Sequence, residues 1–249
     1  MVGWVILLLY FVGHAVIMKG KLFGVSVGPG DWKMMTLRAK EALENSDIIC
    51  FPAKAKGSSS FALSIINEAI DTTDKQMEEL IFSMDPRDEV RRESENVAIK
   101  RLCQLLDEGH NVSLITIGDA GVYSTYMYTD AKIREMGYET EIIPGISSFT
   151  YGAAMARLPL MIGDESFCVI PMAKGNSARL EMAVRDLDNI VVMKAFDSME
   201  IVVDILKRNS VPLEKATVMC DVGTDKEYIG PIDLKRDYGY FTTVLIKKK

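Results

Sequence analysis

The chain has 249 residues, a formal net charge of -6, and 48% hydrophobic and 26% charged residues. This length suffices for one large domain or two small ones, and the composition is that of an ordinary α/β protein. The acidic balance argues against general nucleic-acid binding, which needs a basic face.

The cysteines and histidines show no metal-site spacing. None of the four cysteines forms a CxxC pair, and the two histidines are isolated. We therefore predict reduced, partly buried thiols in a cytoplasmic protein, with no disulfide framework and no protein-bound metal. The residues in question are Cys50, Cys103, Cys168, Cys220, His14 and His110.

An almost wholly apolar run, VGWVILLLYFVGHAVI, occupies residues 2–17. It is slightly shorter than the roughly 20 residues of a membrane-spanning helix, and it lacks the leading positive charge and the cleavage site of a signal peptide. We expect residues 1–17 to be an upstream extension outside the natural fold, with Met18 as the natural start and no membrane association. A membrane anchor is the alternative.

The first half of the chain alternates strands with helices. The segment VSLITI is apolar almost throughout, which is typical of a strand covered on both faces. Alternation of this kind predicts a largely parallel sheet with helices packed against it. Strands are expected at 22–28, 48–51, 79–83, 112–117 and 139–143, and helices at 33–45, 60–70, 88–107 and 125–136.

A domain boundary is predicted at Pro144-Gly145, because these residues mark a turn and the first sheet is then complete. The expected domains are therefore an N-terminal α/β domain at 18–143 and a C-terminal α/β domain at 144–249. The closing strands follow one another closely, which favours a mixed sheet. In this half, strands are expected at 166–171, 189–194, 215–221 and 240–247, and helices near 147–156, 178–187 and 197–208.

The first predicted strand ends in the turn Gly28-Pro29-Gly30-Asp31. Gly-rich turns at this place often hold phosphates, but the lysine of a Walker loop and the third glycine of a dinucleotide fingerprint are missing. Pro29 also has no N–H to donate to a phosphate oxygen. The turn suits a close approach to a flat or uncharged group, although alone it is more typical of an ordinary tight turn.

Two further loops end at the same edge of the predicted sheet. The segment Gly118-Asp119-Ala120-Gly121 follows the strand at 112–117, and Pro144-Gly145-Ile146-Ser147-Ser148 follows the strand at 139–143. Ligands of open α/β sheets bind at the carboxyl ends of strands, so the loops together predict a site. Asp119 is either a hydrogen-bond acceptor for a ribose hydroxyl or an ammonium group, or a helix N-cap, and Ser147 and Ser148 are also candidates for capping.

Several segments together resemble the S-adenosylmethionine-dependent tetrapyrrole methyltransferases of cobalamin and sirohaem synthesis. The resemblance runs from about Lys21 to Ile246. Within the family it is strongest to the subgroup that methylates C-20 of precorrin-2 or of its cobalt-loaded form, cobalt-factor II. The segments are GVSVGPGDWKMMTLRAKEAL, ICFPAKAKGSSSFALSI, FSMDPRDEV, GDAGVYSTYMY, IIPGISSFTYGAAMARLPL and YFTTVLI.

The resemblance implies two α/β domains with the active site in the cleft between them, usually in a homodimer. It also implies that S-adenosylmethionine lies in this cleft. The family usually has Gly-Asp-Pro where this chain has Gly118-Asp119-Ala120, a change that frees the backbone of the loop. The residues implied for the methyl donor are Pro29, Gly118, Asp119, Ala120, Val122, Tyr123, Ser147, Ser148, Met193 and Gly223.

Methyl transfer from a sulfonium needs neither a metal nor a covalent nucleophile, so the absence of such motifs is expected. The protein's task is positioning and desolvation. A proton must leave the methylated carbon, to water or to a side chain. Tyr123 and Asp119 are candidates by location, but the sequence identifies no catalytic base.

The implied acceptor is an anionic tetrapyrrole with eight carboxylates, so an acidic protein must place positive charge at the mouth of its cleft. Lys54 and Lys56, beside a Gly-Ser loop, are the predicted substrate contacts. Arg87, Arg91 and Arg92 are candidates too, but a solvated helix face paired with glutamates is the favoured interpretation for them.

Three other functions are less well supported. Diphthine synthase shares the implied fold and donor, but the segments at 51–57 and 123–128 match the cobalamin subgroup instead. A dinucleotide-dependent oxidoreductase lacks its GxGxxG fingerprint. A membrane-anchored binding module without catalysis would depend on residues 1–17.

Overall fold

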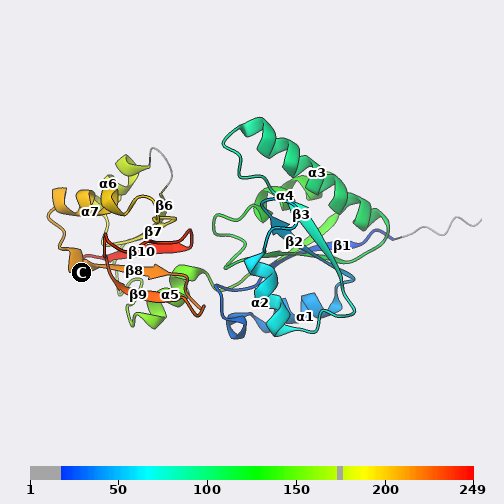
Figure 1. Cartoon of the computed structure of the whole chain (residues 1–249), viewed down its shortest axis with the longest axis horizontal. Helices are drawn as coiled ribbons and strands as arrows, with labels where there is room; N and C mark the ends of the chain where they lie inside the picture. The colour runs from blue at the N-terminus through cyan, green and yellow to red at the C-terminus, as the bar shows by residue number, and fades with distance from the viewer. Residues whose placement is uncertain (1–17, 173–175) are drawn as a thin grey trace, which may run out of the picture.

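The computed structural model describes residues 18–172 and 176–249, and these residues form two lobes side by side (Figure 1). Each lobe contains one five-stranded sheet. The apolar run at 2–17 lies outside the described residues. Among the residues that are described, no helix is long and apolar enough to span a membrane.

The N-terminal lobe is a parallel sheet in the order β3-β2-β4-β1-β5. Helices α1 and α2 cover one face, and α3 and α4 cover the other (Figure 1). Its elements are β1 (Lys21–Ser26), α1 (Leu37–Asn45), β2 (Ile48–Ala53), α2 (Phe61–Ala69), β3 (Gln76–Ile81), α3 (Asp88–Asp107), β4 (Val112–Thr116), α4 (Tyr126–Glu135) and β5 (Glu139–Ile143).

The C-terminal lobe has a mixed sheet in the order β6-β7-β10-β8-β9, in which only β6 and β7 are parallel. Helices α6 and α7 pack on one face and α5 on the other. The elements are α5 (Ser148–Met155), β6 (Phe167–Pro171), α6 (Ser177–Asp186), β7 (Asn189–Met193), α7 (Met199–Arg208), β8 (Ala216–Cys220), β9 (Tyr228–Pro231) and β10 (Thr242–Lys247).

The fold of two α/β domains predicted from the sequence is confirmed, as is the mixed second sheet. Strand β4 is covered on both faces, since Leu114 packs toward α3 and α4 while Ile115 packs toward α1 and α2. The first sheet ends with β5 at Ile143 and the second begins with β6 at Phe167. The domain division at Pro144 stays a prediction, placed within this connection.

Four details of the predicted elements are wrong. The helix expected at 33–45 is divided, because Thr36 accepts a hydrogen bond from the Ala39 amide at 3.1 Å and starts α1 only there. Strand β3 begins at Gln76 instead of 79, and β9 was not predicted. The last strand begins at Thr242 instead of 240, because Tyr240 and Phe241 turn out of the ladder.

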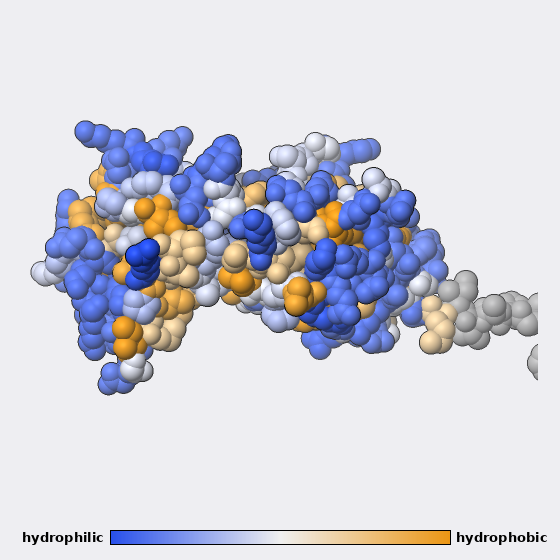
Figure 2. Space-filling view, turned by 90° about the horizontal axis from the view of Figure 1, so that it is seen from below, coloured by the Kyte–Doolittle hydropathy of each residue, from blue (hydrophilic) through white to orange (hydrophobic). Residues whose placement is uncertain are grey.

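Figure 2 shows the side of the molecule on which α1, α2 and α5 lie: hydrophilic residues cover the outer ends of the lobes, and apolar residues gather around their junction. On this face of the molecule, apolar residues therefore gather at the junction between the lobes.

Helix α3 supplies much of the N-terminal core, and Leu102 on it is fully buried. We predict that Leu102→Ala lowers the free energy of unfolding by about 2–5 kcal/mol, because it leaves a cavity. Leu37→Ala, at an 87% exposed position on α1, is the matched control and should change it by less than about 0.5 kcal/mol. Denaturant unfolding followed by circular dichroism measures both, and equal effects would contradict the packing described.

Candidate active site

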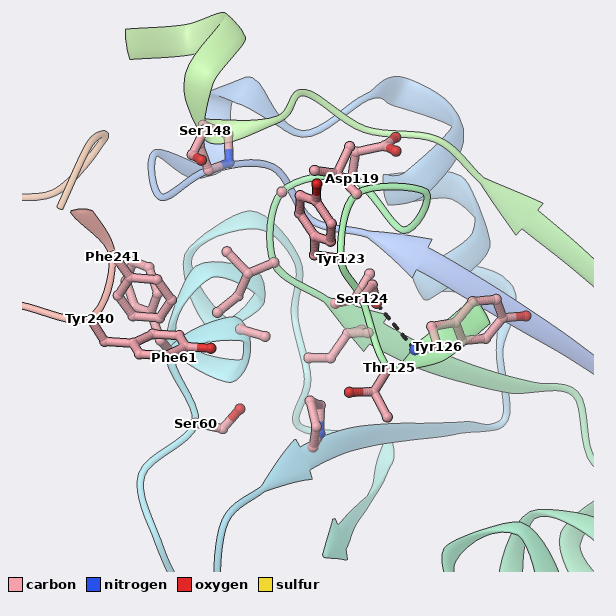
Figure 3. A pocket seen from close by; sticks show the side chains of 18 of the residues that line it. Ser60, Phe61, Asp119, Tyr123, Ser124, Thr125, Tyr126, Ser148, Tyr240 and Phe241 are labelled. Carbon is pink, nitrogen blue, oxygen red and sulfur yellow. Dashed lines mark hydrogen bonds between the residues drawn. The ribbon is translucent and has the colours of Figure 1, made fainter. Parts of the chain in front are cut away.

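A cavity of about 490 Å³ lies between the two lobes. Its walls come from the carboxyl ends of β2 and β4, the turn after β1, the start of α2, and the ends of β7, β8 and β10 nearest the N-terminal lobe. The volume is that of a pocket for one drug-sized ligand. Figure 3 shows side chains of both lobes pointing into it.

Two glycines join the loops that follow β1 and β4. Gly28 and Gly118 form an isolated antiparallel bridge, with N–H to carbonyl distances of 3.3 and 2.7 Å. Both glycines have φ in the left-handed region, at +82° and +71°, which other residues rarely adopt. The Ala120 amide donates to the Ser26 hydroxyl at 2.9 Å, so the second loop is also tied to β1 itself.

Asp119 fastens the third loop to this pair. One carboxylate oxygen accepts from the Gly121 amide at 2.8 Å, and the other accepts from the Gly145 amide at 2.7 Å. The N-cap of α4 is Thr125, so Asp119 does not cap that helix. The carboxylate instead connects the loops after β4 and β5, and it lines the cavity at the same time.

The lobes touch through backbone at the turn after β1. A Cβ added to Gly30 would lie 2.5 Å from the Val222 carbonyl oxygen, and one added to Gly223 would lie 2.6 Å from the Asp31 amide nitrogen. Only glycine permits so close an approach at these positions. On the other side of the cavity, the Tyr123 hydroxyl donates to the Val169 carbonyl of β6 at 3.0 Å, which also joins the lobes.

Aromatic rings close another wall. Phe61 at the start of α2 packs against Phe241 with 5.4 Å between ring centroids, and Phe241 packs edge-on against Tyr240 at 5.4 Å. Figure 3 shows these three rings together at one side of the cavity. They come from both lobes and give this side of the cleft an apolar wall, in which Tyr240 and Phe241 are 36% and 42% exposed.

Three lining residues other than glycine have a left-handed backbone: Tyr123, Lys194 and Asp221, with φ of 49°, 57° and 48°. Each follows the end of a strand, after β4, β7 and β8 respectively. Strained backbone of this kind collects at functional sites.

The structure brings most of the predicted site residues to this cavity. Those that line it are Pro29, Lys54, Gly118, Asp119, Val122, Tyr123, Ser147, Ser148 and Met193. Ala120 is buried behind its loop, Gly223 supports the turn at Gly30, and Lys56 is exposed and does not line the cavity. The roles of all these residues toward a ligand stay predictions.

Other lining residues were not foreseen from the sequence. The sequence predicts Tyr240 and Phe241 as the first residues of the strand at 240–247, and Lys194 as the last residue of the strand at 189–194. Their positions depend on how the second sheet meets the first lobe, for which the sequence gives no local signal. The additional residues include Phe61, Phe82, Thr116, Thr125, Lys194, Asp221, Tyr240 and Phe241.

The capping and arginine interpretations are partly altered. Ser147 is the N-cap residue of α5, but its hydroxyl bonds the Thr150 hydroxyl at 2.8 Å instead of a backbone amide. Arg87 and Arg91 pair with Asp85 and Asp88, not with glutamates, and they do not line the cavity. The solvated helix face is therefore the better description of these arginines.

Burial favours the protonated form of one phenol at the cavity and of the cysteine thiols, none of which lines the cavity. Burial raises the pKa of the Tyr123 phenol, which already donates its proton to Val169. Burial likewise raises the pKa of all four cysteine thiols, none of which is in a disulfide. Within residues 18–172 and 176–249, no group of three metal-ligating side chains is close enough to hold an ion.

Comparison with known proteins supports the sequence resemblance. The family model for tetrapyrrole (corrin/porphyrin) methylases matches residues 21–236. A probable cobalt-precorrin-2 C(20)-methyltransferase of Methanocaldococcus jannaschii is 39% identical over 175 residues, which are 70% of this chain and 72% of that protein. The cobalt-precorrin-2 C(20)-methyltransferase of Salmonella typhimurium is 30% identical over 237 residues, 93% of this chain and 98% of that protein.

Solved structures share the fold. A cobalt precorrin-4 methyltransferase of cobalamin biosynthesis superposes with a TM-score of 0.69 at 18% identity, covering 91% of this chain and 94% of its own. The methyltransferase CobJ superposes with a TM-score of 0.68 at 20% identity, covering 92% and 95%. The two-domain fold expected from the sequence motifs is thus confirmed.

The link made by Asp119 gives a direct prediction. Asp119→Asn should lower the free energy of unfolding by about 1–3 kcal/mol, because the new amide nitrogen faces a backbone N–H and one hydrogen bond to a charged acceptor is lost. It should also speed hydrogen exchange at Gly121 or Gly145. Mass-spectrometric hydrogen exchange and thermal melting measure these effects.

Asp71→Asn is the matched control, since Asp71 also accepts from a backbone amide, that of Thr73, but in an exposed loop. It should change stability by less than about 0.5 kcal/mol. An Asp119→Asn protein with unchanged exchange in both loops would show that the carboxylate does not hold them together.

Proposed function

Because the chain belongs to the tetrapyrrole (corrin/porphyrin) methylase family, we propose that it is an S-adenosylmethionine-dependent methyltransferase acting on C-20 of cobalt-loaded precorrin-2 in cobalamin biosynthesis. The observation that carries the proposal is the cleft between two α/β lobes, bounded by glycine loops that match the family motifs. The relative from Salmonella typhimurium supports the reaction, since the likeness extends over almost the whole of both chains.

The cleft suits a methyl donor of this kind. Glycine loops leave room beside the backbone, and Asp119 and Asp221 give the cavity negative charge that complements a sulfonium cation. Pro29, Ser147 and Met193 complete the walls around these loops. We infer that the donor lies against the ends of β1 and β4, where Asp119 keeps the loops in place.

The reaction moves a methyl group from sulfur to carbon: the sulfur–methyl bond breaks, the bond to C-20 forms, and the proton of C-20 is released. The products are S-adenosylhomocysteine, the methylated tetrapyrrole and a proton. The protein contributes orientation and exclusion of water. Tyr123 is held protonated against β6, so it is not the proton acceptor, and water at the open side of the cleft is the simplest one.

The tetrapyrrole extends out of the cavity, whose 490 Å³ is the size of one small ligand. Phe82 and Met84 give this side an apolar wall, and Lys54 supplies positive charge for the peripheral carboxylates. Cobalt, when present, is part of the acceptor. We favour the cobalt-loaded acceptor because the two relatives at 39% and 30% identity carry that name.

The homodimer implied by the sequence resemblance, and the cytoplasmic location, remain predictions. Gel filtration with light scattering tests the first, and an apparent mass near twice 27.7 kDa is expected.

The function is tested by transfer of a carbon-13 methyl group from S-adenosylmethionine under anaerobic conditions. Metal-free precorrin-2 and its cobalt complexes, the reduced one and the oxidised one, are compared side by side, and NMR locates the label. We expect label at C-20, with the cobalt-loaded acceptors preferred. Donor binding without methylation of any of the three would contradict the proposed substrate and favour another reaction of the family fold, such as that of diphthine synthase.

The contact between the lobes gives a second prediction. Gly30→Ala should lower methyl transfer roughly tenfold or more, because overpacking against the Val222 carbonyl costs about 1–3 kcal/mol and shifts the turn after β1. Gly239→Ala is the control, since its Cβ would meet only ordinary contacts at 3.5 Å. Equal rates for the two variants would show that close approach at Gly30 is unimportant for the reaction.

A further inference from the structure

Four charged side chains line the cavity, and they differ in their hydrogen-bond and ion-pair partners. Asp119 accepts two backbone hydrogen bonds, and Asp221 accepts from the Cys220 thiol at 3.3 Å. Lys54 and Lys194 have no carboxylate within 4 Å among the described residues. Within the part of the chain that the structure describes, the cleft therefore contains two ammonium groups without an anionic partner.

The two lysines come from different lobes and meet at one ring. Lys54 follows β2 in the first lobe, and Lys194 follows β7 in the second. Their ammonium nitrogens lie 5.4 and 5.9 Å from the centroid of the Tyr240 ring. The ring thus holds both positive charges at the same wall of the cavity.

Tyr240 is itself held by neighbouring rings. Phe196 packs against it at 5.7 Å and Phe241 at 5.4 Å, and Phe241 in turn contacts Phe61 across the cleft. The Tyr240 ring is therefore held in place by residues of both lobes. An aromatic face attracts an ammonium group less strongly than a carboxylate that accepts a charge-assisted hydrogen bond. A carboxylate ligand would displace water from the lysines and leave the ring in place.

We propose that Lys54 and Lys194 bind peripheral carboxylates of the acceptor from opposite lobes, with Tyr240 as the platform that positions both ammonium groups. The inference rests on the proposed function, because it takes a tetrapyrrole polycarboxylate as the ligand. It replaces Lys56 by Lys194 in the pair expected from the sequence, since Lys56 does not line the cavity.

A carboxylate at this wall has two sources, the acceptor and the methionine part of the donor. Figure 3 shows Tyr240 and Ser60 at one side of the cavity and Asp119 and Ser148 away from them, at the glycine loops. The loops are the place inferred for the donor. The wall formed by Lys54 and Lys194, called the lysine wall below, is therefore assigned to the acceptor. Binding of the acceptor then ties the two lobes together, because it engages one cation from each.

The test uses the full chain with uroporphyrin, a fluorescent octacarboxylate tetrapyrrole that accepts no methyl group at C-20 here, and with a water-soluble tetracationic porphyrin. Fluorescence titration gives the Kd of each, and calorimetry gives the Kd of S-adenosylmethionine. The variants are Lys54→Met and Lys194→Met, and Lys56→Met is the matched control in the same loop. Met keeps the apolar stem of lysine and removes the charge.

We expect Lys54→Met and Lys194→Met each to raise the Kd for uroporphyrin about tenfold, the size expected when one charged hydrogen bond is lost. Lys56→Met should change the Kd for uroporphyrin less than twofold. None of the three lysine variants should change the Kd of S-adenosylmethionine. Tyr240→Leu should weaken uroporphyrin in the same direction, and Tyr240→Phe should restore the affinity, since the ring and not its hydroxyl positions the lysines.

An unchanged Kd for uroporphyrin in Lys194→Met would overturn the proposal. So would a raised Kd for S-adenosylmethionine in either lysine variant, which would assign the wall to the donor's carboxylate. A loss of affinity for the tetracationic porphyrin equal to that for uroporphyrin would mean that the lysines act only on the shape of the cleft.

Failure of the proposed function is a separate result. Lysine-dependent binding of uroporphyrin by a wild-type protein that methylates no form of precorrin-2 would remove the proposed reaction and leave the carboxylate pair standing. Methylation at C-20 together with lysine-independent binding of uroporphyrin would support the proposed reaction and remove the proposed role of the two lysines.

Discussion

Close backbone contact at glycines is the constraint on which the cleft depends. Gly28 and Gly118 bridge two strand ends of the first lobe, and Gly30 meets Gly223 where the lobes touch. A side chain at any of these positions would require either an unfavourable φ or a separation of the loops. The distance between the lobes, and with it the shape of the cavity, follows from contacts that side chains cannot replace.

The chemistry proposed for the cleft fits this construction. An activated methyl donor needs no nucleophile, so the protein's contribution is to hold two ligands in line and keep water away. The carboxylate of Asp119 has two roles: it holds two loops through their backbone amides, and it also faces the cavity. The apolar junction between the lobes and the rings of Phe61 and Phe241 supply an apolar wall on the other side.

The sequence predicts the secondary structure well because periodicity and capping are local. Helix α3 is found at the residues expected, and the loops at Gly118 and Gly145 lie at strand ends as foreseen. What could not be predicted depends on how two distant segments meet. Phe241 precedes the last strand and packs against Phe61, and Lys194 lines the cavity whereas Lys56 does not. Both outcomes depend on how the second sheet is set against the first lobe, which no local pattern encodes.

The central claim is that both lobes contribute to one site, in which the donor lies on the glycine loops and the acceptor on the lysine wall. A crystal structure with S-adenosylhomocysteine and uroporphyrin tests it most directly. We expect the nucleoside against Gly118 and Met193, and porphyrin carboxylates at Lys54 and Lys194. A nucleoside bound outside the cleft, or a porphyrin held by one lobe alone, would contradict the account.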